Sequence, residues 1–366
     1  MGAIQDIFRT HARAYMEKYG DRMPANHSKT IEAIVNCRSG AYGHTVYECE
    51  ECGELHRVNR SCGNRHCPTC QNGKALEWLD RQMENRLPGH HFMITFTVPE
   101  CIRDFIRGHR RKAYGALFKA SSEAIKTLAK DDRHIGGDLP GFTGVLHTWG
   151  RQLQYHPHIH YVAPGGAFSR KDGRWHCSRL DFYLPVKALS KIYRAKFRDS
   201  MKAEGLFHLI DPKAWKIDWN VNIQAVGSGA DTFKYLSLYV FKVAISDHRI
   251  DDFENGKVTF RYRKKGSSRN RRTTLSAEEF IRRYLQHVLP SGFMKIRRYG
   301  FASTNSSVPL EEIKGLVEIG LGFEEGEFQA ESLAEDFFPR CPACGGKMKY
   351  RYSVLPYMMV PGTGGG

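Results

Sequence analysis

The chain has 366 residues, 41% of them hydrophobic, and its 55 lysine and arginine side chains outnumber 39 acidic ones, for a formal net charge of +16. This length allows two or three domains with proper cores. The positive charge favours a polyanionic partner, with nucleic acid ahead of a membrane surface. No apolar run is long enough to cross a membrane, and the amphipathic start lacks the apolar core of a signal peptide. We therefore expect a cytoplasmic, nucleoid-associated protein with no membrane partner.

Ten cysteines in a chain without a secretion signal indicate metal binding rather than disulfides, because two Cys-x-x-Cys pairs stand near histidines in residues 1–88. Two such pairs can complete a closed tetrahedral Zn²⁺ site. We expect one structural zinc ion to be bound by Cys49, Cys52, Cys67 and Cys70. A second zinc site would combine the remaining candidates, which are Cys37, His44, Cys62 and His66. The alternative is that these cysteines are free and reduced.

The predicted zinc module covers residues 1–88 and begins with two helical segments, at 4–19 and 28–35. A closed zinc site has no open position for water, so this module would be structural. Three arginines near the metal predict a basic finger that binds DNA or a protein partner. They are Arg57, Arg60 and Arg65.

One stretch, WGRQLQYHPHIHY, carries the most distinctive pattern in the chain. In a β-strand His158 and His160 point to the same face, at a spacing at which two imidazoles can bind one metal ion. If the preceding segment FTGVLHTW forms the neighbouring strand, His147 can supply a third ligand. Two glutamines are alternative third ligands, namely Gln152 and Gln154. The competing interpretation is a strand whose imidazoles bind no metal, with His147 as a core residue.

The predicted central region, residues 89–255, contains further regular elements. We expect strands at 90–99 and 215–225, helices at 104–130 and 186–203, and a hairpin around 171–174.

A later segment of this region, GADTFKYLSLYVFKVAISDHR, is predicted to be helical. Tyr235 and Tyr239 are four residues apart and share one helix face, and Lys242 lies on the same side. A phenol with a pKa near about 10 is a poor nucleophile at neutral pH. A nearby lysine and a metal-polarised phosphate can make its attack feasible. The alternative is that both tyrosines are core aromatics.

The C-terminal region, residues 256–366, opens with the basic segment KVTFRYRKKGSSRNRR, in which Phe260 and Tyr262 are interleaved. Positive charge for phosphates and rings for base stacking predict a surface that binds single-stranded DNA, although a solvated hairpin would have the same composition. With a second basic strand near 295–298, the DNA-binding candidates are Arg261, Arg263, Lys264, Lys265, Arg269, Arg271, Arg272, Arg297 and Arg298.

Three further features are expected in this region. Ser276 and Glu279 form a capping box for a helix that continues to about residue 288. A helix near 310–318 is followed by a flexible stretch. Cys341 and Cys344 form half a zinc knuckle, which either borrows ligands from elsewhere or is a reduced pair.

Together these patterns resemble a known family. His-x-His on a strand, followed by a helical Tyr-x-x-x-Tyr-x-x-Lys, resembles the HUH endonucleases, which nick single-stranded DNA in replication initiation, conjugation and transposition. The flanking blocks extend the similarity to IS91-family transposases and their ISCR relatives, over nearly the whole chain to about residue 350. These blocks are CGNRHCPTCQ, TFTVPE, HTWGRQLQYHPHIHYVAPGG, YLSLYVFKVAISDHRI and EFIRRYLQHVLPSGFMKIRRYGF.

The resemblance implies an α+β protein in which a palm-like antiparallel sheet, with helices on one face, follows a helical domain that binds Zn²⁺. It implies that His158 and His160 bind the catalytic Mg²⁺ or Mn²⁺. Tyr235 and Tyr239 are implied as candidate nucleophiles, with Tyr239 preferred because Lys242 follows it.

The implied activity is that of a bacterial rolling-circle-type transposase. Such an enzyme nicks and rejoins single-stranded or hairpin DNA at the ends of its element through a 5′-phosphotyrosine intermediate, and transfers the strand to target DNA. We expect a monomer or a homodimer.

Three other functions share some of these features. A plasmid replication initiator or relaxase has the same nickase core, but the phosphate-binding loop of an attached helicase is absent from this sequence. A zinc-finger DNA-binding regulator would bind DNA without forming a covalent adduct. A metallohydrolase would use the histidines to activate water and would not need the tyrosines.

Overall fold

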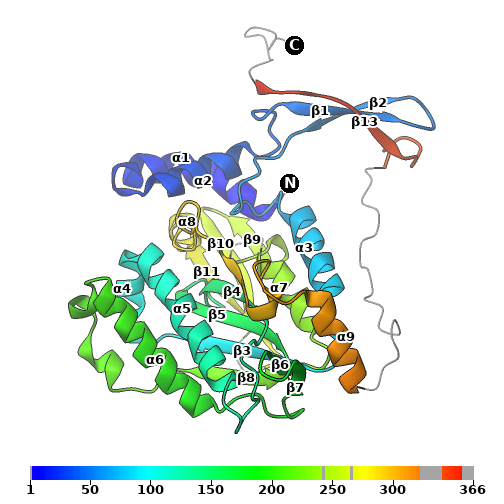
Figure 1. Ribbon diagram of the computed structural model, residues 1–366. Helices are drawn as coiled ribbons and strands as arrows, with labels where there is room; N and C mark the ends of the chain where they lie inside the picture. Colours follow the sequence, from blue (N-terminus) through cyan, green and yellow to red (C-terminus); the bar gives the residue numbers. More distant parts are fainter. Residues whose placement is uncertain (1, 241–243, 264–266, 322–339, 357–366) are drawn as a thin grey trace.

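The computed structural model describes residues 2–240, 244–263, 267–321 and 340–356 (Figure 1). Its centre is a five-stranded sheet in the order β12-β4-β5-β3-β8, in which every neighbouring pair is antiparallel. The strands are β3 (His91–Thr97), β4 (Phe142–Trp149), β5 (Tyr155–Pro164), β8 (Val221–Ala225) and β12 (Ile296–Tyr299). The predicted α+β class with an antiparallel sheet is confirmed.

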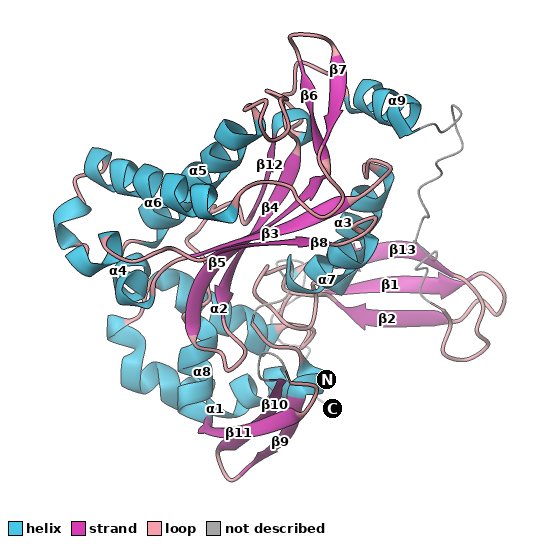
Figure 2. Ribbon diagram, turned by 90° about the horizontal axis from the view of Figure 1, so that it is seen from below, coloured by secondary structure: helices cyan, strands magenta, loops and turns pink. Residues whose placement is uncertain are grey.

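One face of this sheet is covered by a layer of helices, namely α4 (Arg103–Gly108), α5 (Arg110–Ala129) and α6 (Val186–Ala203) (Figure 2). Apolar side chains of β4 and β5, such as Leu146 and Ile159, share one core cluster with α5 and α6. The single helix expected at 104–130 is interrupted at His109, whose backbone leaves the helical region at φ −118° and ψ 38°.

Two helices lie against the opposite face, namely α3 (Asn72–Glu84) and α7 (Ala230–Val240). Trp78 of α3 and Phe233 and Leu236 of α7 form a second cluster with Val145 and Val162 of the sheet. The expectation that helices cover only one face of the sheet was therefore wrong. Because both faces of β4 are covered, all eight of its residues are buried and its sequence shows no alternation of apolar and polar residues.

A second packing unit adjoins the sheet. It contains α1 (Ala3–Tyr19), α2 (Ala25–Asn36), α8 (Ala277–Leu285) and an antiparallel sheet of β9 (Ile250–Glu254), β10 (Lys257–Arg263) and β11 (Asn270–Ser276). Their buried side chains form one cluster, so this core draws on all three predicted regions of the chain. The hydroxyl oxygen of Ser276 accepts a hydrogen bond from the backbone N–H of Glu279, as the predicted cap requires.

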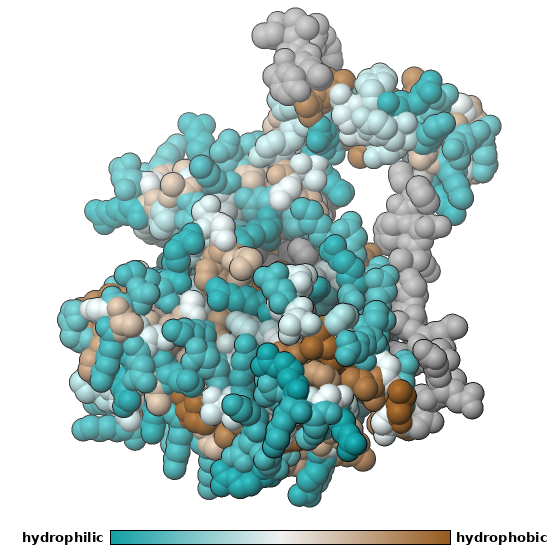
Figure 3. Space-filling view, in the orientation of Figure 1, coloured by the Kyte–Doolittle hydropathy of each residue, from teal (hydrophilic) through white to brown (hydrophobic). Residues whose placement is uncertain are grey.

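A three-stranded antiparallel sheet extends from the main body (Figure 1). It consists of β1 (His44–Cys49), β2 (Leu55–Asn59) and β13 (Met348–Val354), in the order β13-β1-β2. We call this sheet and its two turns the finger. In the space-filling view the finger stands clear of the main body, and its surface mixes hydrophilic and hydrophobic residues (Figure 3).

The remaining elements complete the main body. They are the hairpin β6 (Gly166–Ser169) and β7 (Arg174–Cys177), the helix α9 (Leu310–Leu321), and six short 3-10 helices among the described residues: Gly20–Arg22, Glu100–Ile102, Phe207–Leu209, Pro212–Trp215, Asp247–Arg249 and Gly300–Ala302. The strand expected at 215–225 is restricted to β8. None of the helices in the described part of the chain is long and apolar enough to span a membrane.

We predict that Gly144→Ala, in the middle of β4, destabilises the protein by about 1–3 kcal/mol through overpacking. A Cβ atom at Gly144 would lie 2.3 Å from Cε1 of the buried Tyr161, whose hydroxyl is hydrogen-bonded to that of Ser121 at 2.7 Å. Urea denaturation measures the effect. The control is Gly115→Ala on α5, where nothing lies within 4 Å of the added atom. That variant should be neutral or up to about 1 kcal/mol more stable, since alanine favours a helix. Equal effects of the two variants would contradict the prediction.

Candidate functional site

Three histidines meet on the α3/α7 face of the central sheet. β4 and β5 pair so that His147 lies directly opposite His158, and His160 follows two positions along β5. One ring nitrogen of each histidine lies within 4.8 Å of the others, and the ring centroids of His147 and His160 are 4.7 Å apart. The predicted pairing of these strands is thus observed, and it places His147 with the other two imidazoles.

Two members of this histidine triad make hydrogen bonds through Nδ1. Nδ1 of His158 lies 2.7 Å from the carbonyl oxygen of His156. A carbonyl only accepts, so Nδ1 carries the proton and Nε2 has a lone pair for a ligand. Nδ1 of His160 lies 2.9 Å from the hydroxyl of Thr95 on β3, a contact that the sequence analysis did not anticipate.

Burial keeps the triad uncharged. It lowers the pKa of His158 to about 4 and holds the pKa values of His147 and His160 well below the usual range. Neutral imidazoles are the form that binds a cation, and three of them leave positions open on a divalent ion. The donor set therefore fits a divalent metal with open coordination positions.

One of the alternative ligands, Gln154, makes a local contact instead. Gln154 is exposed and its side-chain oxygen accepts a hydrogen bond from the backbone of Gln152, within the turn between β4 and β5. His156 is also on the triad's face, with its ring centroid 5.1 Å from that of His158, but it is not among the three clustered ring nitrogens.

Tyr235 lies beside the triad on α7. Its ring centroid is 6.4 Å from that of His160, and the residue is 44% exposed. Its neighbours Phe233 and Leu236 are buried and hold α7 against the sheet. Position 239 lies one turn further along the same helix face, but the side chain of Tyr239 is outside the described part of the structure, and Lys242 lies outside the described residues.

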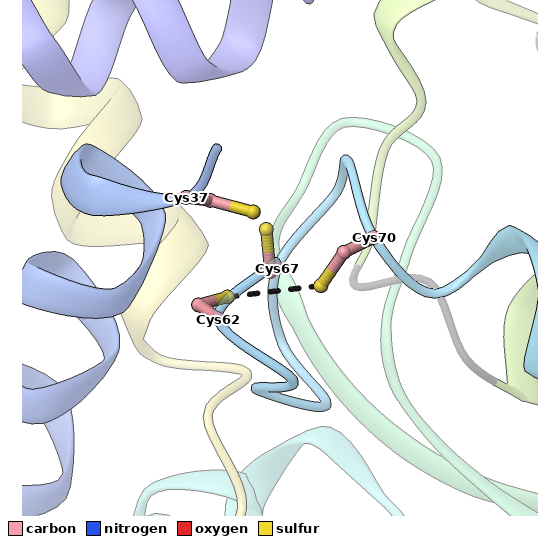
Figure 4. A group of neighbouring side chains, drawn as sticks. All are labelled: Cys37, Cys62, Cys67 and Cys70. Atoms are coloured by element: carbon pink, nitrogen blue, oxygen red, sulfur yellow. Dashed lines mark hydrogen bonds between the residues drawn. The ribbon is translucent and has the colours of Figure 1, made fainter. Parts of the chain in front are cut away.

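Four cysteine side chains converge at the end of α2 (Figure 4). Cys37 follows α2, and Cys62, Cys67 and Cys70 come from the loop that precedes α3; the Sγ atoms of Cys62 and Cys70 are 3.7 Å apart. We call this set the first cysteine group. The buried amide of Gln5 donates hydrogen bonds to the carbonyl oxygens of Ile34 and Cys37, at 2.9 and 2.8 Å, which positions the first ligand.

A second cysteine group lies in the finger. It combines Cys49 and Cys52 with Cys341 and Cys344, and the four Sγ atoms lie within 4.8 Å of one another. This corrects the grouping expected from the sequence. Two Cys-x-x-Cys pairs that are close in sequence do not share a site, because the fold places Cys67 and Cys70 beside α2 and places Cys49 and Cys52 beside the strand β13.

The two histidines expected at zinc have other positions. Nε2 of the buried His66 accepts a hydrogen bond from the backbone N–H of Leu289 at 3.1 Å, and burial lowers the pKa of His66 to about 3. His44 begins β1, opposite Asn59 and Val354, and is not part of either cysteine group.

The basic candidates divide between surface and core. Arg261 and Arg272 both pair with Asp251, at 2.6 and 2.7 Å. The guanidinium of Arg297 instead stacks over Phe118, 4.4 Å from the ring centroid. Phe260 is fully buried and is not available for base stacking, contrary to our expectation.

The other basic candidates have these positions. Arg263, Arg269 and Arg271 lie on or next to β10 and β11, Arg298 is on β12, and Lys264 and Lys265 lie outside the described residues.

Comparisons with known proteins identify the chain. Family models match residues 7–98, described as "Transposase zinc-binding domain" of IS91, and residues 141–308, described as "Putative transposase". The chain is 34% identical over 370 residues to "Putative transposase y4qJ" of Sinorhizobium fredii, which covers 93% of this chain and 92% of that protein. The chain belongs to the IS91 family of transposases.

A second relative agrees with this assignment. The "Transposase for insertion sequence element IS801" of Pseudomonas savastanoi pv. phaseolicola is 26% identical over 353 residues, covering 89% of this chain and 83% of that protein. No solved structure is significantly similar. The resemblance to IS91-family transposases is confirmed, and the protein is an IS91-family transposase with DNA as its substrate and a zinc-binding domain.

The zinc-binding segment 7–98 of this transposase contains the whole first cysteine group. Four thiolates within 4.8 Å of one another suit a closed tetrahedral zinc ion. They lie in the same core cluster as α1 and α8, so the zinc would stabilise the unit that packs against the sheet.

We predict that Gln5→Leu weakens zinc retention in this transposase and costs about 1–3 kcal/mol of stability, since it removes two buried hydrogen bonds. The carbonyl of Ile34 would retain the N–H of Cys37 as a donor, and the carbonyl of Cys37 would retain Arg9. Competition with a coloured zinc chelator and urea denaturation measure the two effects. Gln224→Leu, at an exposed position of β8, is the control and should change neither quantity. Unchanged zinc retention in Gln5→Leu would contradict a positioning role for this amide.

Proposed function

We propose that this IS91-family transposase nicks single-stranded DNA at the ends of its element and rejoins it to target DNA through a covalent 5′-phosphotyrosine. In this proposal His147, His158 and His160 bind Mg²⁺ or Mn²⁺, and a tyrosine of α7 is the nucleophile. The observation that carries the proposal is the position of Tyr235, whose ring centroid is 6.4 Å from that of His160 at the edge of the triad.

The proposed reaction is a transesterification. The phenol oxygen attacks the phosphorus, the bond from phosphorus to the 3′ oxygen breaks, and the departing 3′ oxygen takes up a proton in place of the one that the phenol loses. The 3′-hydroxyl of the acceptor strand then attacks the phosphotyrosine and restores the phenol. Each step replaces one phosphate ester bond with another, so the reaction consumes neither water nor a nucleotide cofactor.

Three features of the chain support this proposed reaction. The triad would hold a divalent cation, which would supply Lewis-acid polarisation of the scissile phosphate. Thr95 and the carbonyl of His156 orient two of the three imidazoles. The buried residues Phe233 and Leu236 fix α7 so that Tyr235 reaches the rim of the site.

Two tyrosines on one helix face could serve two DNA ends. The backbone of α7 places positions 235 and 239 one turn apart, so one tyrosine could hold the first 5′ end while the other accepts the second. We retain Tyr239 as the preferred first nucleophile because Lys242 follows it, and we assign Tyr235 to the second transfer.

The basic segment is proposed to bind the DNA backbone next to the triad. Nη1 of Arg151, in the turn between β4 and β5, donates a hydrogen bond to the carbonyl oxygen of Arg263 at 2.8 Å, which connects β10 to the strands that carry the triad. Phosphates of the DNA would compete with Asp251 for Arg261 and Arg272. Because contacts with phosphates release counterions, the affinity for DNA should decrease as the salt concentration increases.

The test is to incubate the full chain with oligonucleotides of the element ends, single-stranded and duplex, in the presence of Mn²⁺. A covalent protein–DNA adduct on a denaturing gel is expected with single strands only. His158→Ala and the double variant Tyr235→Phe/Tyr239→Phe should reduce adduct formation on the order of a thousand-fold or more. Tyr350→Phe, which changes an exposed tyrosine of the finger, is the matched control and should keep full activity.

Two outcomes would reject the proposal. Cleavage that persists in the double tyrosine variant would assign the reaction to metal-activated water. Binding of the ends without any adduct, in both Mg²⁺ and Mn²⁺, would leave only a DNA-binding role for this protein.

A separate prediction concerns the support of His160. Thr95→Val removes the hydroxyl that contacts Nδ1 of His160 and should weaken Mn²⁺ binding about 10–100-fold, as is usual when a supporting hydrogen bond of a ligand is lost. Isothermal titration calorimetry measures the affinity. Thr97→Val, two residues along the same strand, is the control and should bind Mn²⁺ as the parent does. An unchanged affinity in Thr95→Val would show that this hydroxyl does not support the metal site.

A further inference from the structure

The second cysteine group joins two parts of the chain that are remote in sequence. Sγ of Cys49 lies 3.4 Å from Sγ of Cys344, and Sγ of Cys52 lies 3.8 Å from Sγ of Cys341; these pairs are separated by 295 and 289 positions. The segment that matches the zinc-binding domain ends at residue 98 and includes only the first half of this group. The half at Cys341 and Cys344 therefore has no assigned role.

The two halves have the same backbone structure. Each reads Cys-x-x-Cys-Gly, and in each the glycine adopts a left-handed conformation, with φ of 71° at Gly53 and 79° at Gly345. The N–H of that glycine donates to the carbonyl of the first cysteine, at 3.0 Å for Gly53 and Cys49 and 2.8 Å for Gly345 and Cys341.

A second backbone bond repeats in the same way. The N–H of Cys49 donates to the carbonyl of Glu54 at 3.0 Å, and the N–H of Cys341 donates to the carbonyl of Gly346 at 2.8 Å, five residues ahead in both cases. Glycine is required because its φ is positive, which other residues rarely adopt. Two equivalent turns that face each other direct four sulfurs to one point.

The sulfur distances fit a metal. A tetrahedral ion with Zn–S bonds of about 2.3 Å places its sulfurs about 3.8 Å apart. The contacts of 3.4 and 3.8 Å are close to this separation, and the whole set lies within 4.8 Å. Nε2 of His56 lies 3.3 Å from Sγ of Cys341, where an N–H donor would stabilise a bound thiolate.

The finger is too small to fold by burial alone. Its buried cluster consists of Cys49, Cys341 and Met348, with Tyr47 partly buried beside them. Val46 of β1 is also buried, but four other large side chains of the finger are exposed, by 60% at Leu55, 47% at Val58, 57% at Tyr350 and 54% at Tyr352. A sheet with so small a core needs another source of stability, and a structural metal can supply it.

We propose that Cys49, Cys52, Cys341 and Cys344 bind a second structural Zn²⁺, which holds β13 on the β1–β2 hairpin and so makes the finger from the two remote parts of the chain. This site is separate from the first cysteine group, which lies in the core beside α1 and α2. Its function does not depend on the nickase chemistry proposed above.

Zinc counting by native mass spectrometry of the full chain, purified with zinc, tests the proposal. The parent and every variant carry His158→Ala, so that the histidine triad adds no zinc to the count. The parent should carry two zinc ions, and Cys341→Ser/Cys344→Ser should carry one. Cys101→Ser/Cys177→Ser is the matched control, because both cysteines are exposed and belong to neither group, and it should retain two. A parent with one zinc ion, or a Cys341→Ser/Cys344→Ser variant that keeps two, would overturn the proposal.

Hydrogen exchange on the same proteins gives an independent measurement. In Cys341→Ser/Cys344→Ser the amides of β1 and β2 should lose protection, whereas those of β4 and β5 should keep it. Retained protection of β4 and β5 shows that the main body is folded, so the loss of zinc is local. Unchanged protection of β1 and β2 would mean that no metal holds the finger together, and the proposal would be rejected.

The two zinc sites should also differ in how readily they lose metal. Cys52 and Cys344 are exposed, whereas Cys37 and Cys67 are buried and all members of the first group lie in or against a large core cluster. A chelator should therefore remove the finger's zinc first, in a step that is absent from Cys341→Ser/Cys344→Ser. If the chelator removed all zinc from the parent in a single step, the assignment of the more labile zinc ion to the finger would be wrong.

Discussion

The register between β4 and β5 is the constraint on which the candidate active site depends. It places His147 opposite His158, and a shift by one residue would turn His147 to the other face of the sheet. Helices on both faces bury these strands, which opposes such a shift because the apolar residues of both faces would have to exchange positions. The same burial removes water from the imidazoles and keeps them neutral. Packing and ligand chemistry are therefore not independent here, and a change that exposes the triad to water would raise the pKa values of its imidazoles toward the ordinary histidine value.

Much of this site could be predicted because its signals are local. Alternate histidines on one strand share a face in any fold, and β4 follows from an apolar segment that is close to β5 in the chain. Helix α6 is found where its amphipathic pattern predicts it. The tyrosine helix was predicted from the same kind of pattern, although the spacing of Tyr235 and Tyr239 alone does not distinguish a nucleophile from a core aromatic residue. Their position relative to His160 required the tertiary structure.

The cysteine partners could not be predicted, because spacing in the sequence describes only half of each site. Cys52 and Cys341 are 289 positions apart, and no short-range pattern connects them. Two residues that the sequence suggested for zinc binding and base stacking are instead buried in the core. His66 accepts a hydrogen bond from the backbone of Leu289, and Phe260 packs in a core that includes α1 and α8. Composition indicates that a segment is basic and aromatic, but it does not indicate which rings the fold will bury.

The separation of the finger's two halves has a consequence for biosynthesis. The ribosome makes β1 and β2 before the central sheet, and makes β13 only after that sheet and α7 have been translated. A nascent or prematurely terminated chain can therefore contain the histidine triad while its finger still lacks the strand β13. Contacts made by the assembled finger are restricted to chains translated through Cys344 and β13, so this element distinguishes a finished transposase from its translation intermediates.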